Sequence, residues 1–597
     1  MRELPSAMTR AARCARPLWM RRAGARRQHG SVAVVAVIWL SVAIAALGAL
    51  DVGNVFFARR QLQRTADLAA LAAVQMIGST GGCATATTAA QQNAAANGFT
   101  AGSTTTINTT CGRWDTSKST YFGTSGNPLN AVQVTTTQVV PYFFLGPSRN
   151  VSATATAFAS NIDAFSLGTG IASINTQQSA LLNAILGGLL NANLSLSVGD
   201  TQSLASAHIK LDDLRVALGA ATMKQLLGTS VSVHDLMVAM ATALTAGGNT
   251  VSAGILNTLA LAVPGGQNIA LGNGVSSAPG LLALGLANPE SAASASINAL
   301  DALLVAAQIA QSPHVNPDGS TTQPPAINVA AALPGVAALS LQVVNPPVLA
   351  VGEGGTDGSG LPRTGAQAAS IKLNVTLPPL LAQPLNLGIA TISALSTPIV
   401  LTLAIAPAAA TLSTIDCESS KAATRATMQV TPGIAALCLG ADSNCSQTTK
   451  PARMKVASIS LVLLGQVADV QLAGLKAQAT PGPTSLVFDG SSGSFDVTKS
   501  TNSNAVGSDL SSLTTGLLAS LGAPNAVSIK LLGTADLGAL LQPILSAVGI
   551  ALTGLLQPVF DLLNTLIVPT LSLLGVQVGT ATVHNMSLTC GVSQLVN

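Results

Sequence analysis

The chain has 597 residues, of which 48% are apolar but only 3% aromatic and 8% charged, and its length allows three or four domains. Its formal net charge of +4 is local, because residues 1–30 hold eight arginines and one acid, whereas the other 567 residues hold 19 basic and 22 acidic side chains. A nearly neutral body lacks the clustered Lys and Arg that displace phosphate counterions, which excludes nucleic acid as a partner.

An arginine-rich tail, residues 1–30, precedes an uncharged, mostly apolar run at residues 31–50. A helix over these twenty residues, rising 1.5 Å per residue, would cross a hydrocarbon core about 30 Å thick. Only Arg59, Arg60 and Arg64 follow closely on the far side, so the positive-inside rule predicts a cytoplasmic tail. We therefore expect one transmembrane helix, with everything beyond it outside the inner membrane.

A cleavable signal peptide is the alternative interpretation of this segment. Ala43-Ile44-Ala45 would serve as its cleavage site, but the apolar run is longer than the roughly 7–15 residues usual for a signal. The twin arginines also lack the hydrophobic residue expected soon after them. We therefore expect a retained anchor.

The helical pattern continues beyond the apolar run. Asp51 marks the periplasmic face of the membrane, and residues 56–77 contain no Pro or Gly, so residues 51–77 are expected to be an exported extension of the same helix. One helix over residues 31–77 would be about 70 Å long. The sequence GSTGG at 78–82 should end it.

Residues 78–160 are expected to form a small α+β domain. A helix beginning near Cys83 would end at Asn97-Gly98, a common C-terminal stop signal. Three segments rich in Thr and Val then alternate as strands do: STTTINTT, AVQVTTTQVVPYFF and NVSATATAFAS. They predict a sheet of three or four strands.

The remaining sequence is rich in Leu and Ala and divides by texture, which places the whole chain in the α+β class. Residues 161–311 have helical periodicity, residues 312–365 are rich in Pro and Gly like a linker, and residues 366–597 mix strand-like and helical segments. Leu537–Phe560 is uncharged over 24 residues, but Gln and Pro interrupt it and its large apolar residues form an amphipathic seam. This pattern favours an amphipathic helix, with a second membrane span as the alternative.

Cysteine usage agrees with export, because the six cysteines beyond Cys14 of the tail are even in number. Cys83 and Cys111 are far from the others in sequence and are expected to pair. The other four allow three connectivities, which the sequence leaves open: Cys417, Cys438, Cys445 and Cys590. No CxxC and no nearby pair of histidines occurs, so no zinc site is expected.

Motifs of catalysis and phosphate binding are absent from the sequence, which contains no HExxH, GxSxG or GxxxxGK[ST]. Asp489 and Ser491 resemble part of the metal-binding DxSxS motif of von Willebrand A-type domains, but Gly493 occupies the last position, which favours an Asp-Gly turn. We expect no catalytic residue, no cofactor, no metal and no small-molecule substrate, and therefore no enzyme.

Two stretches carry a family resemblance: RRQHGSVAV at 26–34 and ALDVGNVFFARRQLQRTADLAALAAV at 49–74. They closely resemble the N-terminal segment of the tight-adherence (Tad) Flp pilus-assembly proteins, and the TadG-like branch fits best. The matching motif residues are Gly30, Asp51, Val52, Gly53, Asn54, Ala66 and Asp67. Residues 83–160 resemble the domain that follows in this family, through the strings at 112–114, 130–134 and 141–144.

One position departs from the pattern of pilins and TadE-like pseudopilins. In those proteins a peptidase cuts after a glycine, and a glutamate follows five positions later. Counting from Gly30, that position holds Val35. We therefore expect no cut at Gly30 and no pilin-style insertion into a fibre.

The resemblance implies a membrane-anchored structural or assembly component of a Flp/Tad-type pilus (tight adherence) secretion system. Its partners would be the bacterial inner membrane and other pilus-assembly proteins, contacted in the periplasm. The topology would be single-pass, with a cytoplasmic N-terminus and a periplasmic body. An anchored cell-envelope adhesin or binding protein is the alternative, and an anchored hydrolase with a noncontiguous site is a third, less favoured interpretation.

Overall fold

The structure, a computed structural model, describes most of the chain. The described residues are 29–144, 146–168, 176–263, 265, 268–273, 279–312, 327–328, 338–377, 385–386, 390–394, 399–405, 407–433, 435–439, 454–463, 465–472, 475–479, 482–501, 527–531 and 581–596. The chain divides into two compact units, residues 1–62 with 137–152 and residues 63–136 with 153–597.

Most of the described part of the first unit is one long helix, α1 (His29–Met76), whose last turns belong to the second unit. It is unbroken over 48 residues because it contains no proline and is rich in alanine and leucine, which favour helix. Side chains 31–46 are all exposed, and the most apolar stretch has a mean hydropathy of 2.6. Among the described residues, α1 is the one helix long and apolar enough to cross a membrane. The predicted N-terminal apolar helix is confirmed.

An alanine-packed layer begins the second unit. It comprises residues 66–77 of α1, the helix α2 (Gly82–Ala96) and the strands β1 (Thr105–Trp114), β3 (Ala131–Val140) and β4 (Arg149–Leu167). Buried alanines recur every three or four residues on both helices, at 66, 69, 70 and 73 of α1 and at 86, 90 and 94 of α2. This spacing places them on one face of each helix, where small side chains permit close packing.

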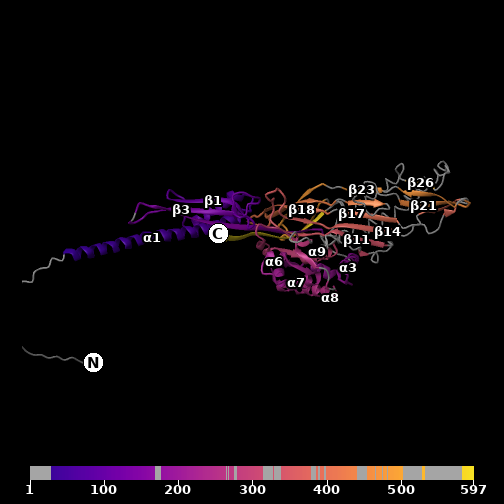
Figure 1. The fold of residues 1–597 in the computed structure, drawn as a ribbon, viewed down its shortest axis with the longest axis horizontal. Helices are drawn as coiled ribbons and strands as arrows, with labels where there is room; N and C mark the ends of the chain where they lie inside the picture. The colour runs from indigo at the N-terminus through magenta and orange to yellow at the C-terminus, as the bar shows by residue number, and fades with distance from the viewer. Residues whose placement is uncertain are drawn as a thin grey trace, which may run out of the picture. The chain divides into compact units, whose positions relative to one another are not determined.

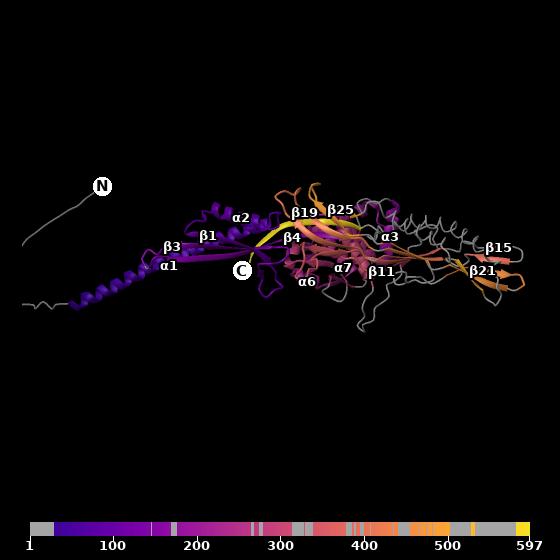
Figure 2. The same cartoon turned by 90° about the horizontal axis from the view of Figure 1, so that it is seen from above.

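The strands of this layer belong to a sheet of ten strands. Its main path runs β2–β1–β3–β4–β12–β8–β7–β6, and the C-terminal strand β27 (Ala581–Val596) pairs with both β4 and β25 (Val497–Thr501). The other members are β2 (Phe122–Gly123), β6 (Ser230–Ser232), β7 (Asn268–Gly272), β8 (Gly280–Gly285) and β12 (Leu349–Gly352). Figure 2 shows β27 in yellow beside β4.

The expected sheet of three or four strands was too small, and β4 explains why. This strand is 19 residues long and continues past residue 160. Its first half alternates between exposed and buried residues, but its second half is buried on both faces. A strand buried on both sides loses the alternation by which it would be recognised. Its second half pairs with β12 and with β27, which brings distant parts of the chain into one sheet.

A leucine-packed layer follows, defined as the helices and short strands of residues 176–310. Its helices are α3 (Thr176–Leu190), α4 (Val198–Ala205), α5 (Leu211–Ala217), α6 (Met223–Leu227), α7 (Val233–Ala246), α8 (Thr250–Ala262) and α9 (Ala299–Ala310). The short strand β5 (His208–Lys210) pairs with β9 (Ser296–Asn298). Figure 1 labels α3 and α6 to α9. Side chains cap several helix starts, as Ser197 does for α4 and Ser232 for α7. Every residue of α9 is buried, so this helix is the centre of the layer.

The described part of residues 327–531 is strand-rich, and three further sheets in it are antiparallel. A four-stranded sheet contains β13 (Gly365–Gln367), β18 (Ala409–Asp416), β19 (Arg425–Thr431) and β24 (Thr484–Asp489). A six-stranded sheet contains β10 (Ile327–Asn328), β11 (Ala338–Asn345), β14 (Ser370–Leu377), β17 (Ile399–Ile405), β20 (Ala435–Leu439) and β23 (Leu475–Ala479). A five-stranded sheet contains β15 (Leu385–Asn386), β16 (Ala390–Ala394), β21 (Met454–Leu461), β22 (Gly465–Leu472) and β26 (Val527–Leu531).

Several expectations concern residues outside those described. They include the basic tail before residue 29 and the apolar stretch Leu537–Phe560, with its alternative of a second span. Within the expected linker at 312–365, the described part contributes β11 and β12, and β12 lies in the ten-stranded sheet. The proposed domain boundaries of the chain remain predictions.

Candidate membrane anchor and interaction sites

The first candidate site is the exposed apolar surface of α1. Trp39 is 68% exposed and Ile38 56%, although both side chains are large and apolar. An unpaired helix surface of this size and hydropathy is costly in water and favourable in a bilayer, where a helix satisfies its own backbone groups. The surface therefore has the properties of a membrane anchor.

The motif residues Asp51 and Asn54 hold a loop at the end of this surface. Asp51 is fully buried, and its carboxylate accepts the backbone N–H of Phe143 (2.7 Å) and of Phe144 (3.0 Å). The Asn54 side chain donates to the carbonyl of Pro141 at 3.5 Å. Hydrogen bonds to a charged acceptor contribute about 1.5–3 kcal/mol each. The motif thus fixes the tip of the β3–β4 hairpin against α1.

The other motif residues serve the helix itself. Val52 is half-exposed, and a Cβ added at Gly53 would meet no atom within 4 Å, so the structure gives no steric reason for that glycine. Ala66 is buried in the alanine-packed layer. Asp67 accepts a hydrogen bond from the side chain of Gln63 at 2.7 Å.

Two disulfides fasten the second unit. Cys83 and Cys111 are joined (S–S 1.96 Å), linking the start of α2 to β1. Cys417 and Cys590 are joined (S–S 1.90 Å), linking the end of β18 to β27 across a sequence separation of 173. Cys438 is also disulfide-bonded, while Cys445 lies outside the described residues. Three connectivities of the last four cysteines were open from the sequence alone.

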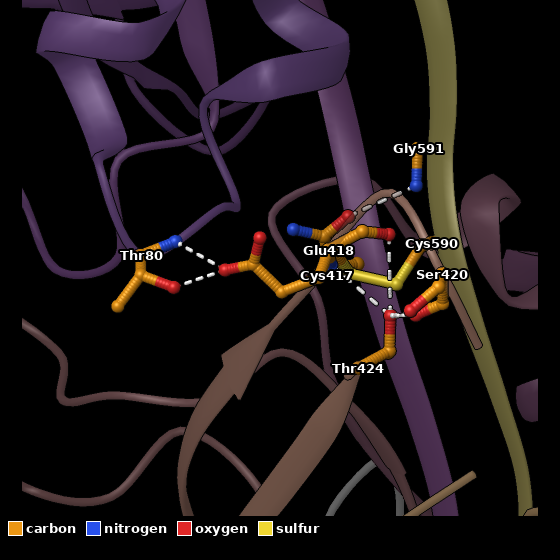
Figure 3. Close-up of a disulfide and its surroundings, with 8 residues drawn as sticks. Thr80, Cys417, Glu418, Ser420, Thr424, Cys590 and Gly591 are labelled. Carbon is orange, nitrogen blue, oxygen red and sulfur yellow. Dashed lines mark hydrogen bonds between the residues drawn. A yellow bond between two sulfur atoms is a disulfide. The ribbon is translucent and has the colours of Figure 1, made fainter. Parts of the chain in front are cut away.

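The turn between α1 and α2 is bonded to the segment around Cys417 (Figure 3). The Cys417 backbone N–H donates to the carbonyl of Gly78 at 2.8 Å. The Glu418 carboxylate accepts the Thr80 hydroxyl and, at 2.9 Å, the Thr80 backbone N–H. These two hydrogen bonds lower the pKa of Glu418. The alanine-packed layer is therefore fastened to strands more than 300 residues later in sequence.

A cleft of ≈ 250 Å³ lies beside this junction, lined by the 77–79 turn, the 127–130 turn, Asn161, Glu353 and part of β18. Behind it, Arg113 and Glu353 form an ion pair (2.7 Å) in which both side chains are at most 5% exposed. Arg113 also donates to the carbonyl of Pro128 at 2.9 Å. Breaking such a buried pair leaves an uncompensated charge, so we interpret it as a structural clamp between β1 and the residue that follows β12.

One histidine in the described residues is bonded to two carboxylates, and together they form a cluster of three titratable side chains. His584 on β27 binds Asp301 of α9 through Nδ1 (2.8 Å) and Asp496 through Nε2 (2.7 Å), beside a cavity of ≈ 450 Å³. Burial disfavours the imidazolium, but the hydrogen bonds and charges of both carboxylates outweigh it and raise the pKa of His584 to about 10. Burial would likewise raise the pKa of Asp496, but hydrogen bonds from His208 and His584 lower it well below its usual range.

This cluster does not have the arrangement of a catalytic triad. Ser166 donates to Asp301 at 2.6 Å rather than to the histidine, and both nitrogens of His584 face carboxylates. A nucleophilic serine needs a free imidazole nitrogen as its base. The cluster is therefore an ion-pair lock between α9, β27 and the segment before β25.

The remaining candidates for chemistry also have structural explanations. Asp489 accepts the backbone N–H of Ser491 (3.1 Å) and its hydroxyl, and Gly493 has φ +84°, as in a turn. Among the described residues, no group of three or more His, Cys, Asp or Glu side chains could hold a metal ion.

Comparison with known families matches three segments of the chain. Residues 30–76 match a family described as putative Flp pilus-assembly TadE/G-like, and residues 71–157 match one described as putative Tad-like Flp pilus-assembly. Residues 178–308, nearly the whole leucine-packed layer, match a domain of unknown function. No curated protein and no solved structure matched.

The first two matches cover α1 and the alanine-packed layer, which carry the residues of the resemblance. The N-terminal segment of this chain is thus that of a Tad-family Flp pilus-assembly protein. These domains are structural rather than enzymatic. They support a role in Flp pilus assembly.

Proposed function

We propose that this protein is a TadG-like, membrane-anchored structural component of a Flp pilus-assembly system. The observation that carries the proposal is the continuity of α1. One helix contains the exposed apolar run of 31–50 and then enters the alanine-packed layer, and the two matched Flp pilus-assembly families cover both parts. The proposed anchor and the matched assembly domains therefore share one continuous helix.

The proposed topology is single-pass, with the N-terminus in the cytoplasm and the body in the periplasm. Eight arginines before residue 31 support this orientation through the positive-inside rule. The disulfides of the second unit support it independently, since such bonds persist in oxidising compartments. A reporter active only outside the cytoplasm should work when fused after Ser160, and inactivity at that junction would contradict the orientation.

The protein would act through surfaces, by holding its body at the membrane for contact with other assembly proteins. We propose that Gly30 is not cut, because the glutamate landmark of processed pilins is Val35 here. The mature chain should begin at Met1 or Arg2, remain in the membrane fraction and be absent from sheared fibres. A mature N-terminus at Ser31 inside purified fibres would instead favour a minor-pilin role.

Deletion of the gene tests the function directly. We expect fewer pili and weaker adherence, with the major pilin still synthesised and processed, and restoration by the full-length gene. Normal piliation with loss of adherence alone would contradict the assembly role. It would favour the alternative of an anchored adhesin.

A further inference from the structure

We propose that the hairpin loop at residues 141–144 is a second membrane contact. Its aromatic rings would lie in the lipid interface at the point where α1 leaves the bilayer on the periplasmic side. The inference rests on the proposed membrane anchoring, and it concerns the first unit alone.

Hydrogen bonds fix the level of the loop along α1. The backbone N–H groups of Phe143 and Phe144 bind the carboxylate of Asp51, at 2.7 and 3.0 Å. Asp51 is the first charged residue after the apolar run of 31–50. The loop therefore lies at the level where the uncharged run of the helix ends, which is the level of the lipid headgroups in the proposed topology.

The aromatic side chains at this level face outward. The chain has only eleven phenylalanines, and four of them expose more than half of their surface in this unit. They are Phe143 (65%) and Phe144 (53%) in the loop, and Phe56 (62%) and Phe57 (61%) on α1, five and six residues beyond Asp51. Rings of this kind are rarely grouped on a surface that faces only water. Phe and Leu side chains form the lipid-inserted face of segments that lie in the membrane interface, so a lipid interface is the environment that suits these rings.

The polar groups of the loop are arranged for the same environment. A carboxylate at the edge of the hydrocarbon is costly. The carboxylate of Asp51 is buried and accepts hydrogen bonds from backbone N–H groups of the loop. Further along, Arg59 and Arg60 on α1 and Arg149 at the start of β4 are exposed. Arginines just beyond an aromatic belt can reach lipid phosphates, and these three suit an anionic bilayer surface.

Lipid photocrosslinking in the full-length protein tests the proposal. The photoreactive residue p-benzoylphenylalanine would replace Phe143, and the protein would be placed in vesicles of phosphatidylethanolamine and phosphatidylglycerol. Trp39, in the middle of the apolar run, is the matched position for the anchor. Tyr121, which is 49% exposed in the second unit, is the matched position for an aromatic residue in water. Mass spectrometry after illumination would identify adducts.

We expect lipid adducts with the photoreactive residue at position 143 and at position 39, and none with it at position 121. The added substitution Asp51→Ala should reduce the adducts at 143 and leave those at 39 unchanged, with mapping of the Cys83–Cys111 bond as the check on folding. Adducts at 39 without lipid adducts at 143, or crosslinks at 143 to protein only, would overturn the loop contact and leave the anchor standing. Absence of lipid at 39 would overturn the anchoring itself.

Discussion

The alanine-packed layer and the leucine-packed layer lie in the same unit but are stabilised differently. In the first, α2 contacts its neighbours through Ala86, Ala90 and Ala94, side chains that bury little apolar area each. In the second, α9 is buried along its whole length among leucines and other large side chains. The first layer has a disulfide, whereas residues 176–310 contain no cysteine. The helices of the alanine-packed layer can approach their neighbours closely only with small side chains. Such side chains contribute little hydrophobic stabilisation, and the disulfide offsets this.

The largest difference in stability between the two layers should appear when the pH is changed. His584, which locks β27 to α9, has its pKa raised from 6.5 to about 10 in the folded protein. Its contribution should be fully present below about pH 6.5 and lost as the pH rises towards 10, a loss of at most about 5 kcal/mol. Residues 63–160 contain no histidine, so the alanine-packed layer should be unaffected in this window.

Denaturant titration at several pH values, read by hydrogen exchange in peptides of each layer, measures this. The variant His584→Asn should abolish the dependence between pH 6.5 and 10. An equal pH response in both layers would contradict the assignment to His584.

Truncating a central leucine should have the second-largest effect on stability. Leu303 of α9 is 1% exposed, and Leu303→Ala should destabilise the leucine-packed layer by about 2–5 kcal/mol through lost burial and a cavity. Leu261, on α8 in the same layer, is 86% exposed, so Leu261→Ala should change stability by no more than about 0.5 kcal/mol. Equal midpoints of denaturation for the two variants would show that α9 is not the centre of that layer.

Removing the N-terminal disulfide should act on the other layer. The double variant Cys83→Ser/Cys111→Ser opens a loop with a sequence separation of 28, for which chain entropy predicts a loss of roughly 3 kcal/mol. The urea midpoint of the α2 peptides should fall while that of α9 is unchanged. Peptide mapping without reduction provides the baseline, and recovery of both cysteines as free thiols in the wild-type protein would refute the bond.

Enlarging a small side chain gives the mildest and most specific contrast. Ala90 on α2 is fully buried, and Ala90→Leu should cost about 1–3 kcal/mol by overpacking the alanine contact. Ala95, exposed on the same helix, serves as the matched position for Ala95→Leu. Similar melting temperatures for both variants would mean that the alanine contact can accommodate a larger side chain and that the layer does not require small residues there.

The parts that sequence predicted are those encoded locally. The apolar run of α1 could be predicted because the charges and the hydropathy that define it lie within one short stretch of sequence. The buried half of β4 was not, since a strand covered on both faces has no alternation, and its partners β12 and β27 lie hundreds of residues away. The sheet was therefore underestimated although its first strands were expected.

The side-chain clusters show the same limit more strongly. Arg113 meets Glu353, and His584 meets Asp301, across separations of 240 and 283 residues. No window of the sequence contains both partners, so only the tertiary fold brings them together. The motif Asp51–Asn54 could be singled out from sequence, but the loop that it binds could not.

The Cys417–Cys590 disulfide has a mechanical consequence. A load applied to the two ends of the second unit cannot extend the chain between these cysteines, however much of it unfolds. An extended chain spans about 3.3–3.6 Å per residue, so the 173-residue separation hides up to roughly 600 Å of contour length from the force. The bond makes that part of the body a tether of fixed length, and pulling a Cys417→Ser/Cys590→Ser variant should release the hidden length.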